Sequence, residues 1–271
     1  MIRILFIGDI VGRPGRELMR RGLSALIDYH HVDLVVANVE NAAAGFGITR
    51  EIGDELLAWG VDVMTSGNHV WDRKEAVTYI GAESRLLRPA NYPSAVPGRG
   101  SYVARSRQGH SVGVINVMGR VFMLDIDDPF TAVLREIEAI GQRARVILVD
   151  FHAEATSAKV AMGWHLDGKV SAVIGTHTHV QTADERLLPK GTAYLTDVGM
   201  TGPHDSIIGV EIDAALGRFL NAMPARFETA AANPRLNAVV IEADESTGLA
   251  SDIERLSYSL DELNLMGGTG A

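Results

Sequence analysis

Five short apolar segments, each followed closely by residue types that bind metal ions, restrict the fold of this chain more than any other feature. The segments cover residues 4–7, 34–37, 61–64, 146–149 and 170–175. Runs this short and this apolar are typical of strands in a sheet that is covered on both faces. Ligands of open α/β sheets bind outside the carboxyl ends of the strands. The polar residues after the five runs are therefore predicted to meet at one edge of the fold.

Amphipathic segments separate these runs, which indicates that strands and helices alternate. We expect strands at residues 2–7, 33–39, 61–65, 112–117, 145–151, 170–175, 192–197 and 236–242. We expect helices at residues 14–29, 49–59, 73–80, 128–143, 154–164 and 209–222. This order predicts an α/β fold with parallel pairing of its strands.

One domain, spanning residues 1–271, accounts for this pattern. The 271 residues, 46% of them hydrophobic, are enough for a sizeable core. Residues 86–102 hold three prolines and two glycines, interrupt the alternation and are expected to form a loop or small cap. The glycine-rich tail, residues 267–271, is expected to be frayed.

The composition narrows the chemistry of any site. The chain has no cysteine, which excludes disulfides, zinc–thiolate sites and iron–sulfur clusters, so a metal would be held by oxygen and nitrogen. The formal net charge of −9 argues against extensive contact with nucleic acid, whereas a small phosphate ester stays compatible because bound cations reverse the local field. We find no signal peptide and no apolar stretch near the ~20 residues of a spanning helix, so we expect a cytoplasmic protein without membrane contact. A homo-oligomer is equally compatible with the sequence.

Carboxylate and amide groups follow the first three runs. Asp9 ends the first run, and Glu40-Asn41 lies just beyond the second. Asn68-His69 follows the third and offers an amide beside an imidazole. Taken alone, each group is also an ordinary turn, cap or loop residue. A phosphate-binding glycine loop at residues 8–13 is disfavoured, because neither the dinucleotide spacing nor the P-loop lysine is present.

Three histidines after the last two runs strengthen the prediction. His152 follows the fourth run, and His177 and His179 follow the fifth. Residues two apart in an extended segment face the same side, so His177 and His179 are predicted to point into one cavity. The other histidines lack such a placement and are expected to be core or surface residues.

Together these side chains exceed what one tetrahedral ion needs and suit two ions that share a bridging ligand. Ligation by oxygen and nitrogen without thiolate is compatible with manganese, iron or zinc. Two ions roughly 3.5–4 Å apart can activate a bridging water and hold a phosphoryl group for in-line attack.

The motifs that contain these residues resemble, in this order, those of the calcineurin-like metallophosphoesterase superfamily. Gly8-Asp9, Gly67-Asn68-His69 and the separate His152 match superfamily motifs. The segment 175–179, Gly-Thr-His-Thr-His, matches the final Gly-His-x-His motif with one inserted residue.

Departures from the superfamily pattern resemble one bacterial branch, the YmdB-like phosphodiesterases. Val11 stands where the superfamily has histidine, Glu40 where a bridging aspartate is usual, and Val70 where an acidic residue is usual. The branch also shows the pair Trp71-Asp72 and a late Asp-x-Gly-Met-x-Gly motif, here residues 197–202. The similarity spans essentially the whole chain.

The resemblance implies a layered α-β-β-α sandwich of metallophosphoesterase type. It also implies two metal ions, divalent or of mixed valence, with iron or manganese favoured and zinc compatible. The implied ligands are Asp9, Glu40 and His179 for one ion, Glu40, Asn68, His152 and His177 for the other, and Asn41 as a supplementary ligand.

The implied activity is hydrolysis of 2′,3′-cyclic nucleotides, small phosphate esters, with His69 protonating the departing ribose oxygen. General acid help of this kind contributes typically ~10²–10⁴-fold. Two alternatives stay open: a phosphomonoesterase or nucleotidase that uses the same ions, and a metal-stabilised regulatory or RNA-binding protein with little catalysis.

Overall fold

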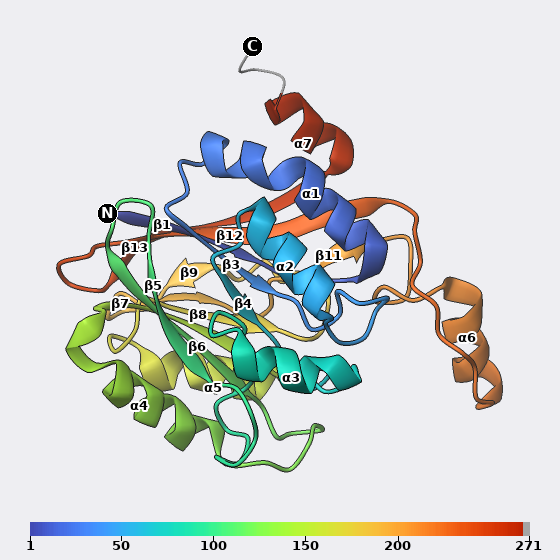
Figure 1. The fold of residues 1–271 in the computed structure, drawn as a ribbon, viewed down its shortest axis with the longest axis horizontal. Coiled ribbons are helices and arrows are strands. Elements are labelled where there is room, and N and C mark those ends of the chain that lie inside the picture. Colours follow the sequence, from blue (N-terminus) through green and yellow to red (C-terminus); the bar gives the residue numbers. More distant parts are fainter. Residues whose placement is uncertain (268–271) are drawn as a thin grey trace.

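Two β-sheets pack face to face between two layers of helices in the computed structural model, which describes residues 1–267 (Figure 1). The tail expected to be frayed lies outside the described residues from position 268 onward. The first sheet has seven strands in the order β2-β11-β12-β1-β3-β4, with β13 also paired to β12. The second has six strands in the order β5-β6-β7-β8-β10-β9.

Most of the strands are short, and most of their residues are buried. The first sheet consists of β1 (Ile2–Ile7), β2 (Asp9–Ile10), β3 (Leu34–Asn38), β4 (Val63–Thr65), β11 (Met200–Pro203), β12 (Pro234–Ala243) and β13 (Ala250–Ser259). The second consists of β5 (Ser101–Arg105), β6 (Ser111–Met118), β7 (Val146–His152), β8 (Ala172–Thr176), β9 (Arg186–Leu187) and β10 (Ala193–Leu195).

Helices cover the outer face of each sheet. The helices are α1 (Gly12–Tyr29), α2 (Arg50–Trp59), α3 (Lys74–Ala82), α4 (Pro129–Ile140), α5 (Thr156–Leu166), α6 (Ile212–Asn221) and α7 (Leu260–Gly267), with a 3₁₀ turn η1 (Gly141–Arg143) after α4. Residues of α1, α2, α3 and α7 share one hydrophobic core with the first sheet, and residues of α4 and α5 share another with the second. A third core lies between the two sheets. This arrangement is the expected α-β-β-α sandwich.

The alternation of side chains along β1 shows why residues 4–7 are apolar at every position. Ile2, Ile4 and Phe6 belong to the core between the sheets. Leu5 and Ile7 belong to the core beneath the helices. Because successive side chains of a strand point to opposite faces, a strand buried on both faces needs an apolar residue at every position.

All eight expected strands and all six expected helices are present, with shifts of a few residues at their ends. Parallel pairing is correct for β1-β3-β4 and for β6-β7-β8-β10, but wrong for β12, which runs antiparallel to both β1 and β13. A tight turn at residues 244–249 joins β12 to β13, and a connection this short can only link antiparallel strands.

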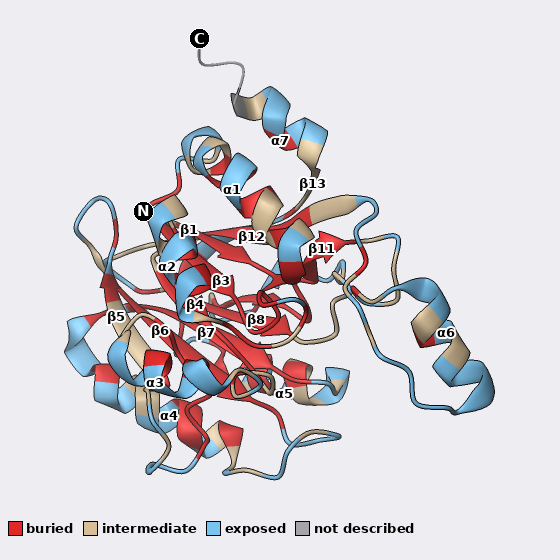
Figure 2. Cartoon of the chain, turned by 45° about the vertical axis from the view of Figure 1, so that its right-hand side comes forward, coloured by how far each residue is buried: buried red, intermediate tan, exposed pale blue. Residues whose placement is uncertain are grey.

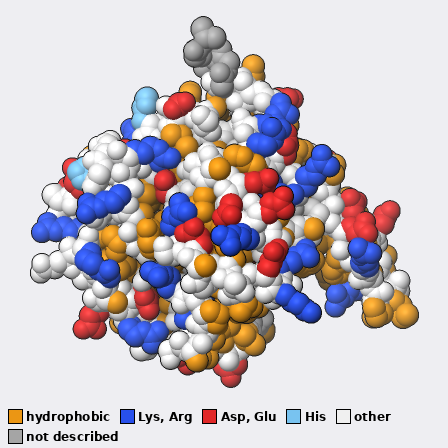
Figure 3. All heavy atoms as spheres, in the orientation of Figure 1, with side chains coloured by type: hydrophobic (Ala, Val, Ile, Leu, Met, Phe, Trp, Pro, Cys, Tyr) orange, Lys and Arg blue, Asp and Glu red, His pale blue; other side chains and the backbone are white. Residues whose placement is uncertain are grey.

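Helix α6 differs from the other expected helices because it extends away from the sheets. Only Ala215 is buried in it, and most of its surface is exposed (Figure 2). Figure 3 shows hydrophobic side chains at the outer end of α6. Phe219 and Leu220 in this helix are 81% and 79% exposed. Within the described residues, no helix has the length and apolar character needed to cross a membrane.

Candidate metal centre and active site

The predicted site residues lie at the carboxyl ends of strands from both sheets. Asp9 follows β1, Glu40 and Asn41 follow β3, and Asn68 and His69 follow β4 in the first sheet. In the second sheet, His152 is the last residue of β7, and the segment 177–179 follows β8. Two stacked sheets therefore present their ligand-bearing edges to one common region.

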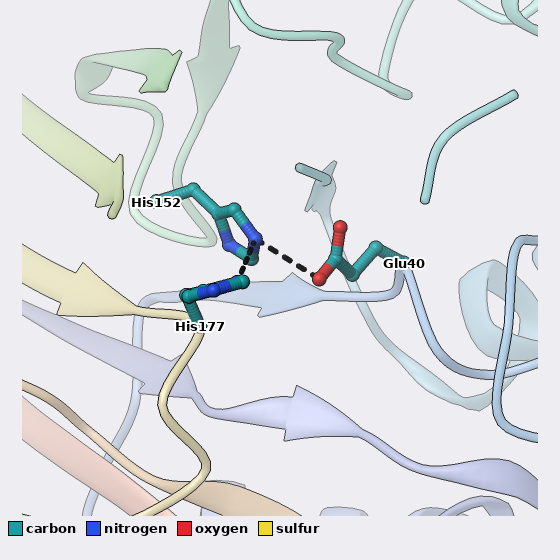
Figure 4. A group of neighbouring side chains, drawn as sticks. All are labelled: Glu40, His152 and His177. Atoms are coloured by element: carbon teal, nitrogen blue, oxygen red, sulfur yellow. Dashed lines mark hydrogen bonds and ion pairs between the residues drawn. The ribbon is translucent and has the colours of Figure 1, made fainter. Parts of the chain in front are cut away.

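Glu40, His152 and His177 form the closest group and point toward one another (Figure 4). The Nε2 atom of His152 lies 3.0 Å from Oε1 of Glu40 and 3.0 Å from Nδ1 of His177. The amide oxygen of Asn68 lies 3.1 Å from the same Nε2. Three potential ligand atoms thus lie close to Nε2 of His152, which is itself a fourth.

Two buried oxygen atoms of neighbouring residues accept no hydrogen bond from the described residues. Asp9 is fully buried, and its Oδ1 has no hydrogen-bond partner among the described residues; neither has Oδ1 of the buried Asn41. The second carboxylate oxygen of Asp9 accepts a hydrogen bond from the backbone N–H of His177 at 3.2 Å. Buried polar atoms are normally satisfied, so these two oxygens fit a site that binds cations.

His179 lies in the same cavity but outside the closest group. Its Nδ1 is 2.8 Å from the carbonyl oxygen of Ile208, which leaves Nε2 as the nitrogen able to bind a metal. His152 is oriented in a similar way, because its Nδ1 is 2.9 Å from Oγ1 of Thr176, which donates to Asp150 at 2.7 Å. Partners of this kind fix the direction of a metal-binding imidazole.

Burial and mutual charge perturb the ionisation of this group. Burial raises the pKa of the Asp9 carboxyl well above its usual value. Burial alone would raise the pKa of Glu40, but the charge and hydrogen bond of His152 lower it to about 2. Burial would lower the pKa of His152, but Glu40 and Asp9 raise it to about 9. Burial and the nearby His152 charge lower the pKa of His177 to about 3.

The backbone that carries His177 and His179 is strained and is held by a buried ion pair. Both histidines have positive φ angles, 101° and 64°, which residues other than glycine rarely adopt. Between them, Thr178 donates from its backbone N–H and its hydroxyl to Oδ2 of Asp197, at 3.1 and 2.8 Å. Nζ of Lys159, in α5, lies 2.5 Å from the same oxygen.

Sequence reasoning did not single out Lys159, and it reached Asp197 only as part of a family motif. A lone lysine in a helix gives no signal that it is buried. Asp197 follows the short strand β10, in the same position relative to its strand as the predicted ligands, and that placement is the signal that was available.

His69, which is predicted to be the proton donor, lines the cavity next to Glu40. Its Nδ1 is 2.7 Å from the Asp72 carboxylate, so Nε2 is the ring nitrogen that can meet a substrate. Its backbone N–H donates to Oε2 of Glu40 at 3.1 Å, which ties the residue to the metal-binding group. The ring of Phe46 packs edge-on against the ring of His69, with 5.0 Å between the two ring centroids.

A cavity of about 440 Å³ opens over these residues. It is lined by Val11, Glu40, Asn41, Gly45, Phe46, His69, Glu154, His177, Thr178, His179, Ile208, Gly209, Val210, Phe227, Glu228 and Thr229. Segments 208–210 and 227–229, on either side of α6, form one wall. The segment 86–102 does not contribute to the lining.

The sequence model of YmdB-like proteins matches residues 5–256. The chain belongs to this family. A Bacillus subtilis (strain 168) protein, named 2′,3′-cyclic-nucleotide 2′-phosphodiesterase, is 46% identical over 97% of this chain and 99% of its own length. A Mycoplasma pneumoniae protein, named putative phosphatase/phosphodiesterase, is 35% identical over 91% of this chain and 89% of its own length.

Solved structures of similar proteins share the fold. A hypothetical protein from Thermus thermophilus has a TM-score of 0.88 and 43% identity, over 95% of this chain and 99% of its own. A structure titled as a novel phosphatase from Mycoplasma pneumoniae has a TM-score of 0.89 and 33% identity, over 95% of this chain and 93% of its own. The YmdB-like resemblance, the metallophosphoesterase fold and the expected class, a phosphoester hydrolase, are thus confirmed.

Proposed function

We propose that this YmdB-like protein hydrolyses 2′,3′-cyclic nucleotides at a site that holds two metal ions. The observation that carries the proposal is the convergence of Asp9, Glu40, Asn68, His152 and His177 from five strand ends, with two buried oxygens that accept no hydrogen bond from the described residues. The name of the Bacillus subtilis relative supplies the substrate class.

The donor set supports a particular division of ligands. We assign Asp9, Glu40 and His179 to one ion, and Glu40, Asn68, His152 and His177 to the other, with Asn41 as a supplementary ligand. Mixed oxygen and nitrogen donors without thiolate favour iron or manganese, with zinc compatible. When bound, such ions lower the pKa of an attacking water and bind the phosphate oxygens.

A residue of the chain itself, His69, protonates the leaving group. Water attacks phosphorus in line, the bond between phosphorus and O2′ breaks, and His69 transfers the proton on Nε2 to the departing O2′. The product is a 3′-nucleotide, the proton of the attacking water passes to solvent, and His69 regains its proton from solvent. Asp72 holds the ring through Nδ1, which keeps Nε2 directed at the substrate.

A metal-reconstitution assay tests this function. Protein treated with EDTA is compared with protein loaded with manganese or iron, using 2′,3′-cyclic AMP, AMP and a short RNA. Metal-dependent turnover of the cyclic ester with little turnover of AMP supports the proposal. Turnover of AMP alone would identify a phosphomonoesterase, and RNA binding that survives chelation without cleavage would identify a binding protein.

A further inference from the structure

The cavity over the metal centre has an apolar end that the chemistry described above does not use. Its lining combines Glu40 and the histidines with the apolar side chains of Phe46, Ile208, Val210 and Phe227, which together are called the apolar end. Pockets of roughly 300–1,000 Å³ with an apolar lining and a few polar groups are typical of small-molecule sites. The apolar end therefore has the character of a binding site for the part of the substrate that does not react.

The position of His69 shows which part of the substrate reaches this end. As the proton donor, His69 must touch O2′ of the ribose, so the nucleoside lies on its side of the phosphate. The aromatic ring next to His69 in the cavity is that of Phe46, with centroids 5.0 Å apart and an interplanar angle of 65°. Resting on the proposed function, we propose that Phe46 and Phe227 form the binding site for the base of the nucleotide.

Phe46 is held in place by the loop that carries the metal-binding residues. Arg73 donates from Nε to the carbonyl oxygen of Phe46 at 3.0 Å. Gly45, the preceding residue, donates its N–H to the carbonyl oxygen of Asn41 at 3.1 Å. Gly47, the following residue, has a φ of +77°, and a Cβ there would come within 2.7 Å of the Arg73 side chain. A backbone fixed in this way limits the positions open to the Phe46 ring, which lowers the entropy lost when a ligand binds.

Phe227 belongs to the wall formed by segments 208–210 and 227–229. Its neighbour Glu228 accepts a backbone hydrogen bond from Glu211 at 3.0 Å, and Val210 forms a bridge with Thr229. The guanidinium carbon of Arg218 lies 5.4 Å from the centroid of the Phe227 ring. The segment after α6 is therefore paired to the segment before it, and the ring has a defined place in the wall.

The chemistry of this end predicts recognition by stacking, with little discrimination among bases. Every base has a π-face, whereas discrimination requires hydrogen bonds to base edges. Among the lining residues that are described, Glu228 and Thr229 are the polar side chains of this wall, and Thr229 packs against Gly12 and Gly45. We therefore expect kcat/KM values within about tenfold of one another for the four 2′,3′-cyclic nucleotides.

The test compares a substrate with and without a base. The readout is the ratio of kcat/KM for 2′,3′-cyclic AMP to kcat/KM for ribose 2′,3′-cyclic phosphate. In Phe46→Ala and Phe227→Ala this ratio should fall about tenfold, and Phe46→Trp should preserve it. Phe122→Ala is the matched control, because Phe122 is 88% exposed and does not line the cavity.

Each outcome separates this proposal from the function on which it rests. A ratio unchanged in both alanine variants, or a wild-type ratio near one, would overturn the base-binding site while leaving cyclic phosphate hydrolysis in place. Failure of wild-type protein to hydrolyse either substrate would overturn the proposed function and the base site with it. A variant such as His69→Ala should lower both kcat/KM values and leave their ratio unchanged.

Discussion

Replacing Lys159 by methionine would test whether a buried ion pair holds the histidine loop. Lys159 and Asp197 are each 1% exposed, and Nζ and Oδ2 are 2.5 Å apart. Methionine approximates the length and volume of the lysine stem but removes its charge. The Asp197 carboxylate would keep its hydrogen bonds from Thr178 and Gly199 but lose its only ion-pair partner among the described residues.

The expected cost follows from leaving one charge of a buried pair uncompensated. Removing one partner of such a pair costs about 3–5 kcal/mol. At roughly 2–4 °C per kcal/mol for a chain of this size, the melting temperature should fall by ~6–20 °C. Because Asp197 fixes the strained backbone between His177 and His179, the affinity for manganese should fall as well.

Two measurements separate the effect on folding from the effect on the site. Thermal unfolding in EDTA, followed by circular dichroism, gives the loss of stability, and titration with manganese at 25 °C gives the affinity of the folded protein. Arg88→Met is the matched control, because Arg88 is also buried but bonds to the carbonyl oxygens of Pro89 and Pro97, away from the site. A melting temperature within about 2 °C of wild type would refute the reasoning on stability. A stability loss with unchanged manganese affinity, as expected for Arg88→Met, would show that Lys159 supports only the fold.

Three further predictions concern the metal centre. Manganese affinity should rise about tenfold per pH unit from pH 7 to 9, because the ion displaces a proton from His152. Burial would lower that pKa, but Glu40 and Asp9 raise it to about 9; a flat calorimetric profile would contradict this. Asn41→Ala should weaken the binding of one ion, measured as metal content per chain, and full occupancy of both ions would count against its role. His69→Ala should reduce kcat by about 10²–10⁴-fold with both ions retained; loss of metal and fold together would show that His69 is structural.

The sequence was sufficient to predict the layers and the edge at which the site lies. Strands buried on both faces carry apolar runs, such as residues 4–7 of β1, and parallel strands present their carboxyl ends at the same edge. The strands that were missed carry weaker signals. β2 and β9 have two residues each, and β11 has four. β5 and β13 lie at the edges of their sheets, and both contain polar residues.

Features that depend on tertiary contacts could not be predicted in the same way. The amphipathic pattern of α6 indicates a helix but not whether another element covers its apolar side, and here most of that side is exposed. The burial of Lys159 depends on Asp197, which is 38 residues away in the sequence. Likewise, segments 208–210 and 227–229 contribute to the cavity because the chain departs from the sheets before α6 and returns to them after it.

The balance of charge at the strand ends favours the binding of cations. Asp9, Glu40, Asp150 and Asp197 are all buried, and each of the other three lies within electrostatic reach of Asp9. Burial raises the pKa of Asp9, and it raises that of Asp150 to about 6, so both carboxyl groups are poorly stabilised as anions by the protein alone. Of the described basic groups, the buried Lys159 and His152 offset two of the four charges. Because buried carboxylates without a balancing positive charge are costly, the remaining negative charge favours binding of metal ions, and the same carboxylates that destabilise the metal-free protein then stabilise the loaded one.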